Sequence, residues 1–336
     1  MKRLIALMLL FFIVSIVNAQ ELKEDISVHD PVMIKQNETY YLFCTGRGIA
    51  VWSSTDRKYW KAEEPVFNEA PEWAVKAIPG FRNHIWAPDI SYYKGLYYLY
   101  YSVSAFGKNT SAIGLATNKT LNPTDPEFQW IDHGEIIQSV PGKTNFNAID
   151  PNLITDKKGN PYLAFGSFWD GLKLAKLSKD RLHVAQNLNE LPTIASRKKD
   201  PKIKGNMPST EGNPVSAGGN AIEAPFVFRK NGWFYLFASI DYCCKGPAST
   251  YKMIVGRAKN ISGPYLDKEG NSMATGGGSL LLEGNDKWYG VGHNAVCTFD
   301  GDDYLIFHGY DASDKGISKL RIEKLRWDSN KWPVVN

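Results

Sequence analysis

The stretch Glu223-Ala224-Pro225-Phe226-Val227-Phe228, followed by a polar turn at Asn231-Gly232 and by Phe234-Tyr235-Leu236-Phe237, decides the fold. Two short apolar runs joined by a turn that contains glycine are typical of a β-hairpin. The second run is rich in aromatic residues, which strands favour. A hairpin is therefore the predicted building unit of this chain.

The same pattern occurs four more times along the 336 residues, in copies that begin at His29, Trp86, Ile149 and Gly292. Each copy has a short first strand, a polar turn and a second strand rich in aromatic residues. A third apolar run follows each hairpin. These runs are residues 49–52, 113–116, 172–175, 254–258 and 320–322.

Five such repeats indicate one architecture for most of the chain. Corresponding positions of successive copies lie 57 to 74 residues apart, so five units fill the chain after its N-terminal segment. A single four-stranded unit leaves both of its faces exposed, and stacking the units around an axis buries them. The sequence therefore predicts an all-β fold, a five-bladed β-propeller, with residues 20–336 as one catalytic domain.

The first residues have the pattern of a secretory signal peptide. Lys2 and Arg3 precede an apolar run over residues 4–17, and Val17-Asn18-Ala19 is a small-residue cleavage pattern. We expect residues 1–19 to be removed on export to the periplasm or the cell exterior. No second run is long and apolar enough to span a bilayer, so no membrane association is expected after removal.

Composition excludes several classes of protein. An apolar fraction of 43% is too high for a disordered chain. The 39 basic and 35 acidic residues give a net charge of only +4, which argues against a nucleic-acid partner. We expect a monomer. Of the four cysteines, the adjacent Cys243 and Cys244 either form a disulfide or remain two thiols beside a site.

Differences between the repeats point to chemistry. The residues that precede the repeated proline, or its Asn294 counterpart, converge at one mouth of a propeller, and they are Asp30, Ala87, Asp150, Ala224 and His293. Glu223 stands directly before Ala224. A single such Asp is most simply a turn residue. Three acids at one mouth repel one another, and an acid paired with a carboxylate is what glycosidic bond cleavage requires.

His293 occupies the fifth of these equivalent positions. Either it is a buried histidine bonded to backbone, or it binds an ion on the axis through one ring nitrogen. A shell rich in oxygen ligands would favour calcium (Ca²⁺) over a transition metal, but the spacing alone does not decide between the two interpretations.

Aromatic and amide residues near the mouth suit a sugar. Aromatic faces pack on the apolar face of a sugar ring, and amides and hydroxyls bond its hydroxyl groups. The aromatic candidates are Trp86, Phe106, Phe168 and Trp169, and the polar ones are Asn147 and Ser167. Core packing is the alternative for each aromatic, and it is the interpretation we give to Tyr98, Tyr235 and Phe237.

These motifs resemble glycoside hydrolase family 43. The resemblance lies in Ser27-Val28-His29-Asp30-Pro31, Trp86-Ala87-Pro88-Asp89, Asn147-Ala148-Ile149-Asp150-Pro151 and Ile222-Glu223-Ala224-Pro225. Stretches similar to the endo-acting arabinanase branch are Ser102 to Asn109, Phe165-Gly166-Ser167-Phe168-Trp169-Asp170-Gly171, Asp241-Tyr242-Cys243-Cys244-Lys245-Gly246 and Gly290-Val291-Gly292-His293-Asn294.

The resemblance implies a secreted, inverting endo-hydrolase of 1,5-linked α-L-arabinan, in its short single-domain form. It implies that Asp30 is the general base, that Glu223 is the general acid, and that Asp150 orients Glu223 and raises its pKa. It implies that His293 binds calcium. The implied substrate contacts are Asp30, Trp86, Phe106, Gly107, Asn147, Ala148, Ile149, Asp150, Ser167, Phe168 and Trp169. Asp89 is not among the family's three acids, and we interpret it either as structural or as a residue that supports the acids from behind.

Two alternatives remain open from the sequence. One is an exo-acting α-L-arabinofuranosidase or β-xylosidase of the same fold, which differs in loops that close one end of the cleft. The other is a sugar-binding propeller without catalysis, for which three mutually repelling carboxylates would have no use. Arabinan and arabino-oligosaccharides are the expected partners in the first two cases.

Overall fold

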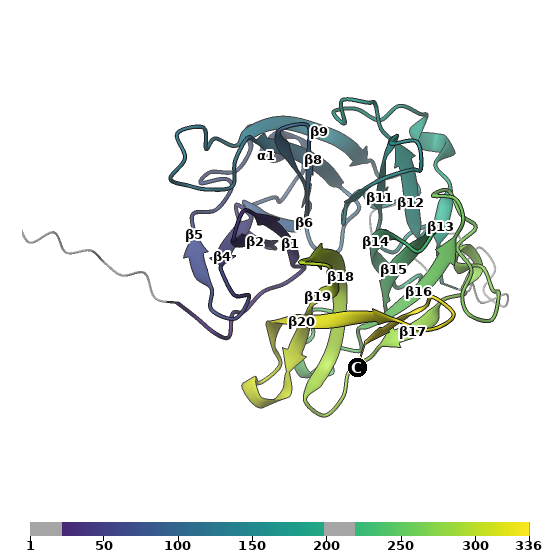
Figure 1. Cartoon of the computed structure of the whole chain (residues 1–336). Coiled ribbons are helices and arrows are strands. Elements are labelled where there is room, and N and C mark those ends of the chain that lie inside the picture. The colour runs from purple at the N-terminus through teal and green to yellow at the C-terminus, as the bar shows by residue number, and fades with distance from the viewer. Residues whose placement is uncertain (1–21, 198–218, 336) are drawn as a thin grey trace, which may run out of the picture.

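The computed structural model describes residues 22–197 and 219–335, and it confirms the predicted all-β, five-bladed β-propeller. The predicted signal peptide lies outside the described residues. Five antiparallel sheets follow one another along the chain and surround a common axis (Figure 1). No helix among the described residues is both long and apolar enough to cross a bilayer.

Each blade is built from consecutive strands that run from the axis outward. Blade 1 consists of β1 (Val32–Gln36), β2 (Thr39–Cys44), β4 (Ala50–Ser54) and β5 (Lys61–Glu63). Blade 2 consists of β6 (His84–Tyr93), β7 (Leu96–Val103), β8 (Ser111–Asn118) and β9 (Ile131–Ser139). Blade 3 consists of β10 (Asn152–Thr155), β11 (Pro161–Phe165), β12 (Leu172–Lys176) and β13 (Thr193–Ala195).

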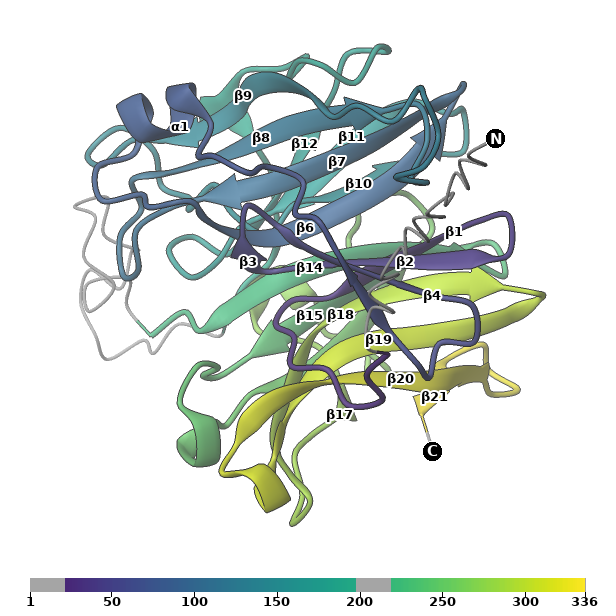
Figure 2. The same cartoon turned by 90° about the vertical axis from the view of Figure 1, so that its left-hand side faces the viewer.

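The last two blades repeat this order. Blade 4 consists of β14 (Ile222–Lys230), β15 (Trp233–Ile240), β16 (Lys252–Ala258) and β17 (Ser279–Leu282). Blade 5 consists of β18 (Trp288–Phe299), β19 (Asp302–Asp311), β20 (Ile317–Trp327) and β21 (Pro333–Val335). The side view shows the blades packed face to face (Figure 2).

Two elements were not predicted from the sequence, one within blade 1 and one between blades 1 and 2. The short strand β3 (Gly46–Arg47) lies between β2 and β4 and pairs with the first residues of β6, which makes the second sheet five-stranded. The helix α1 (Glu72–Ala77) packs against β9 at the rim. Single 3₁₀ turns occupy Leu188–Glu190, Gly246–Ala248, Met273–Thr275 and Ala312–Asp314.

The apolar core is divided among the five blade interfaces. Successive side chains of a strand point to opposite faces, so neighbouring residues enter different clusters. Tyr101 packs between blades 1 and 2, whereas Tyr100 packs between blades 2 and 3. The predicted core residues Tyr98, Tyr235 and Phe237 are buried in this way. Each blade therefore depends on both of its neighbours for burial.

The ring closes through the N-terminal segment. Ser27 pairs with Lys319 of β20, and the Leu320 amide donates to the Ile26 carbonyl at 3.1 Å. Ile26 is also buried in the cluster between blades 5 and 1. The motif that ends in Asp30 is consequently held against the last blade.

Candidate functional site

The five equivalent positions at the start of the inner strands share an unusual backbone. Their φ angles lie between 43° and 56°, in the left-handed region that residues other than glycine rarely adopt. The five residues are Asp30, Ala87, Asp150, Ala224 and His293. Such backbone strain persists where surrounding contacts enforce it, and it concentrates at functional sites. The repeated left-handed residue turns the chain at the mouth of the axis in every blade.

Side chains of the preceding blade bind four of these five amides. The Ala87 amide donates to Thr45 Oγ1 at 2.9 Å, and the Asp150 amide donates to Ser102 Oγ at 3.0 Å. The His293 amide donates to Ser239 Oγ at 2.8 Å. The Asp30 amide donates to His308 Nδ1 at 3.1 Å. The second strand of one blade thus fixes the strained residue of the next.

Blade 3 departs from this pattern in a way that positions an acid. Gly166 follows β11 there and has no side chain to offer to blade 4. The Ala224 amide donates instead to Asp150 Oδ2 at 3.1 Å. Because Ala224 directly follows Glu223, this bond holds the Asp150 carboxyl beside the backbone of Glu223. Ser167, in the same loop as Gly166, donates its hydroxyl to Glu223 Oε2 at 2.8 Å.

Asp30 lies among donors from blades 1 and 5. Its Oδ1 is 2.9 Å from both His29 Nδ1 and His293 Nδ1, and its Oδ2 accepts the Thr45 hydroxyl at 2.5 Å. Burial opposes ionisation, but electrostatic attraction to the two histidines and hydrogen bonds from them outweigh it and hold the pKa of Asp30 well below its usual range. Asp30 is therefore the acid that is most firmly ionised.

The pKa values of Asp150 and His293 are raised, whereas that of Asp30 is lowered. Burial, together with the negative charges of Glu223 and Asp30, raises the pKa of Asp150 above its usual value. Burial lowers the pKa of His293, but the surrounding carboxylates outweigh it and raise that pKa. The structure therefore places a carboxylate whose pKa is lowered next to two groups whose pKa values are raised, to about 8 for Asp150 and about 9 for His293.

A small cavity of about 20 Å³ lies on the axis beneath these groups. Asp30, Asp89, Asp150, His293 and Asn294 contribute to its lining. Both amide atoms of the Asn294 side chain are buried and have no hydrogen-bond partner among residues 22–197 and 219–335. The cavity has room for a water molecule or a small ion, and its polar lining offers partners.

The predicted sugar contacts divide into accessible and buried residues. Phe106 is exposed, whereas Trp86, Gly107 and Phe168 are half-buried. Asn147, Ile149 and Ser167 are buried close to the acids. Trp169 is only 2% exposed and Ala148 is fully buried.

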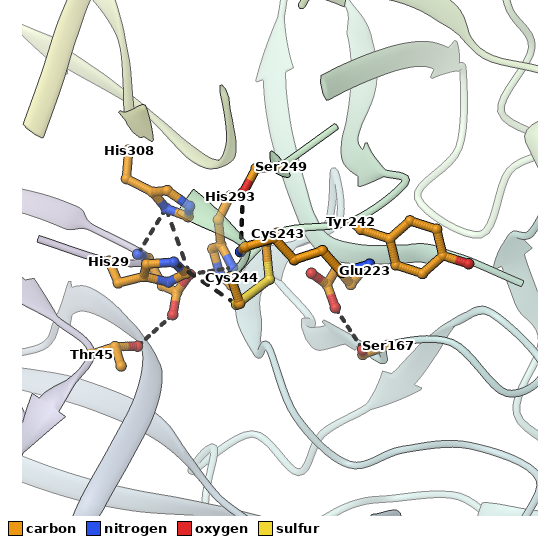
Figure 3. The surroundings of a disulfide bond; sticks show 12 residues. His29, Thr45, Ser167, Glu223, Tyr242, Cys243, Cys244, Ser249, His293 and His308 are labelled. Atoms are coloured by element: carbon orange, nitrogen blue, oxygen red, sulfur yellow. Dashed lines mark hydrogen bonds and ion pairs between the residues drawn. A yellow bond between two sulfur atoms is a disulfide. The ribbon is translucent and has the colours of Figure 1, made fainter. Parts of the chain in front are cut away.

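Sequence comparison of the repeats missed several residues around Asp30. His29 and Thr45 contact Asp30 directly, and Tyr310 contacts it through His29. Figure 3 shows His29, His293 and His308 together beside the Cys243–Cys244 bond. The histidine before Asp30 was the available signal, since the other repeats have no titratable residue there except Glu223. The structure joins Cys243 to Cys244, which resolves the two cysteine interpretations in favour of a disulfide. His308 is fully buried.

Comparisons with known proteins agree with this geometry. The profile of the family described as glycosyl hydrolases family 43 matches residues 25–333. The extracellular exo-α-(1→5)-L-arabinofuranosidase of Cellvibrio japonicus is 49% identical over 93% of this chain and 87% of its own length. The extracellular endo-α-(1→5)-L-arabinanase 1 of Bacillus subtilis is 44% identical over 91% of this chain and 87% of its own length.

A solved structure extends the likeness to three dimensions. The α-L-arabinanase of Cellvibrio cellulosa in complex with arabinohexaose superposes with a TM-score of 0.87 at 48% identity, and the match covers 93% of this chain and 96% of that one. The match of the family profile, these identities and the shared propeller lead to one conclusion. The chain belongs to the family 43 glycosyl hydrolases.

Proposed function

We propose that this protein hydrolyses internal 1,5-α-L-arabinofuranosidic bonds of arabinan with inversion at the anomeric carbon. Relatives named for action on such linkages support the substrate. One observation carries the chemistry: Asp30 and Asp150 line the axial cavity, and the Ala224 amide ties Asp150 to the backbone beside Glu223.

The proposed roles follow from the environment of each carboxyl. Asp30 is ionised and accepts a proton from the water that attacks the anomeric carbon. Glu223 donates a proton to the leaving oxygen from the opposite side of the bond. Asp150 orients Glu223 through the Ala224 amide and repels negative charge on it. Attack by water opposite the leaving group inverts the configuration, so β-anomers should be the first products detected by NMR.

The sugar rings pack on the accessible aromatic faces near the mouth. Phe168 lies in the loop that carries Ser167, and Phe106 and Gly107 lie in the loop that follows β7. Hydroxyl groups of the arabinose units bond to Asn147, whose buried Oδ1 has no hydrogen-bond partner among the described residues. Residues from blades 2 and 3 thus form one side of the substrate site.

Exo action is the second candidate, and the 49% identity to an exo-acting relative favours it. The test is to incubate the protein with linear debranched arabinan and to follow viscosity and reducing ends together. A fast loss of viscosity with few new ends would support internal cleavage. A rise in reducing ends at nearly constant viscosity would establish the exo alternative. No change in either would overturn the arabinan assignment.

We also propose export and a calcium ion on the axis. Both relatives above carry the word extracellular in their names, which supports export. Two residues on the axis could bind such an ion. His293 contacts Asp30 through Nδ1, so its Nε2 is available as a ligand atom. The side-chain amide of Asn294 has no hydrogen-bond partner among the described residues. Bound calcium would add positive charge next to the carboxylates.

The calcium proposal has a readout that is independent of activity. A ligand that binds only the folded state raises the melting temperature, so EDTA should lower it by several degrees and added Ca²⁺ should restore it. His293→Ala should abolish that response. A melting temperature that EDTA leaves unchanged, for protein purified in the presence of calcium, would contradict the proposal.

A further inference from the structure

A chain of hydrogen bonds connects Asp30 to a loop of blade 4. His29 places Nδ1 at 2.9 Å from Asp30 Oδ1 and Nε2 at 2.8 Å from the Tyr310 hydroxyl. The Cys244 amide in turn donates to that hydroxyl at 2.7 Å. Tyr310 is almost fully buried on β19, two residues beyond His308, whose ring stacks on His29 at 3.8 Å between centroids. The chain thus involves blades 1, 4 and 5.

In this chain, each group donates its hydrogen bond to the next group on the way to the Asp30 carboxylate. An ionised Asp30 only accepts hydrogen bonds, so His29 Nδ1 carries a proton. In the neutral imidazole, Nε2 is then an acceptor and the Tyr310 hydroxyl donates to it. Burial raises the pKa of Tyr310, so its hydroxyl keeps that proton. The hydroxyl oxygen is left to accept from Cys244, and chains of bonds with one direction reinforce one another.

The Cys243–Cys244 disulfide restrains the first donor of the chain. A bond between neighbouring cysteines closes a small ring that includes the peptide group joining them, and the amide of Cys244 belongs to that group. Cys244 has a φ of 64°, which a residue with a side chain holds only under restraint. The Lys245 amide is also fixed, because it donates to Ser249 Oγ at 3.1 Å. Figure 3 shows the disulfide between His29 and Glu223.

We propose that Tyr310 and the Cys243–Cys244 disulfide are positioning elements for Asp30, acting through His29 to hold the carboxylate where it activates water. The inference rests on the proposed role of Asp30 as general base. Neither element touches the reacting atoms. Their loss should therefore lower the rate of the chemical step while substrate binding stays intact.

The test compares kcat and KM on debranched arabinan. Tyr310→Phe removes only the hydroxyl, and we expect kcat to fall about tenfold with KM within about twofold of wild type. Cys243→Ser/Cys244→Ser frees the amide without deleting it and should lower kcat about threefold. Tyr100→Phe is the matched control, because Tyr100 is fully buried and donates to the Arg181 carbonyl at 2.6 Å away from the site. It should keep wild-type kcat.

Coupling between the two elements distinguishes this proposal from general loosening. If both act through one chain, adding the serines to Tyr310→Phe should cause no further loss, whereas independent effects would multiply. Multiplying effects, or wild-type kcat in Tyr310→Phe, would overturn the proposal. Should Tyr310→Phe fail to fold, wild-type kcat in the double-serine variant would overturn it. If Asp30→Asn keeps its activity, the role of Asp30 fails instead.

Discussion

At the residue scale, the bond between Asp150 and the Ala224 amide shows how Asp150 would orient Glu223, the proposed general acid, without touching the leaving group itself. The bond forms because blade 3 has Gly166 where the other blades have a side chain that binds the next amide. Asp150 is thereby fixed one residue away from Glu223. Burial and the nearby acids raise the pKa of Asp150, so its charge depends on pH within the working range.

Asp150→Asn should change the pH dependence of hydrolysis. Asparagine can still accept the Ala224 amide, so the geometry survives, but the negative charge that Asp150 acquires as pH rises through about 8 is lost. Without a negative neighbour, the proposed general acid loses its proton more easily and therefore at a lower pH. We expect kcat/KM to fall at least tenfold and the alkaline limb of the pH–rate profile to move to lower pH. An unmoved limb would remove Asp150 from this role.

The sequence predicted Asp30, Asp150 and Glu223 because they place carboxylates at, or directly before, a repeated position that is alanine in two of the five copies. It could not predict Tyr310 or Thr45. Tyr310 lies in a second strand that is aromatic in every blade, so nothing distinguishes it from core residues such as Tyr235. Its contact with His29 depends on how blade 5 faces blade 1, which no local pattern contains.

At the scale of elements, each second strand supports the inner strand of the next blade. Ser102 and Ser239 end or nearly end their strands and accept the amide of a left-handed residue. The hairpins themselves were predictable from their turns and aromatic runs. The strand β3 and the helix α1 were not, because they occur once, and a single short element has no repeat to reveal it.

Ser239→Ala should destabilise the fold through the His293 amide. The substitution leaves that buried donor without its acceptor, which typically costs about 1–3 kcal/mol of unfolding free energy. Ser91→Ala is the matched control, since the buried Ser91 hydroxyl has no hydrogen-bond partner among the described residues. Denaturant titration should show a loss for Ser239→Ala and almost none for Ser91→Ala. Equal losses would contradict the role of the amide bond.

At the scale of the whole molecule, polar residues join the inner strands of successive blades. Asp89 of blade 2 accepts from the Leu153 amide at 2.7 Å and from Asn152 Nδ2 at 3.2 Å. Asn152 then accepts the Val227 amide of blade 4 at 2.8 Å. These bonds connect Asp89 to the inner strands of blades 3 and 4. Burial raises its pKa to about 7, although these two hydrogen bonds oppose the shift.

The raised pKa of Asp89 should make stability depend on pH. Between about pH 4 and pH 7 the folded protein holds a proton that the unfolded chain has released, so the unfolding free energy falls as pH rises. The fall amounts to at most about 4 kcal/mol. Asp89→Asn loses one acceptor and should be less stable at pH 4.5, but its deficit relative to wild type should shrink by pH 8. A deficit that is the same at both values would contradict this.

If Glu223 protonates the leaving oxygen, the effect of replacing it should depend on how much the leaving group needs a proton. Glu223→Gln and wild type would be compared on debranched arabinan and on a dinitrophenyl α-L-arabinotrioside, whose leaving group needs no proton. We predict a loss of at least about 10²-fold on arabinan and a far smaller loss on the activated substrate. An equal loss on both substrates, or wild-type turnover of arabinan, would contradict the assignment.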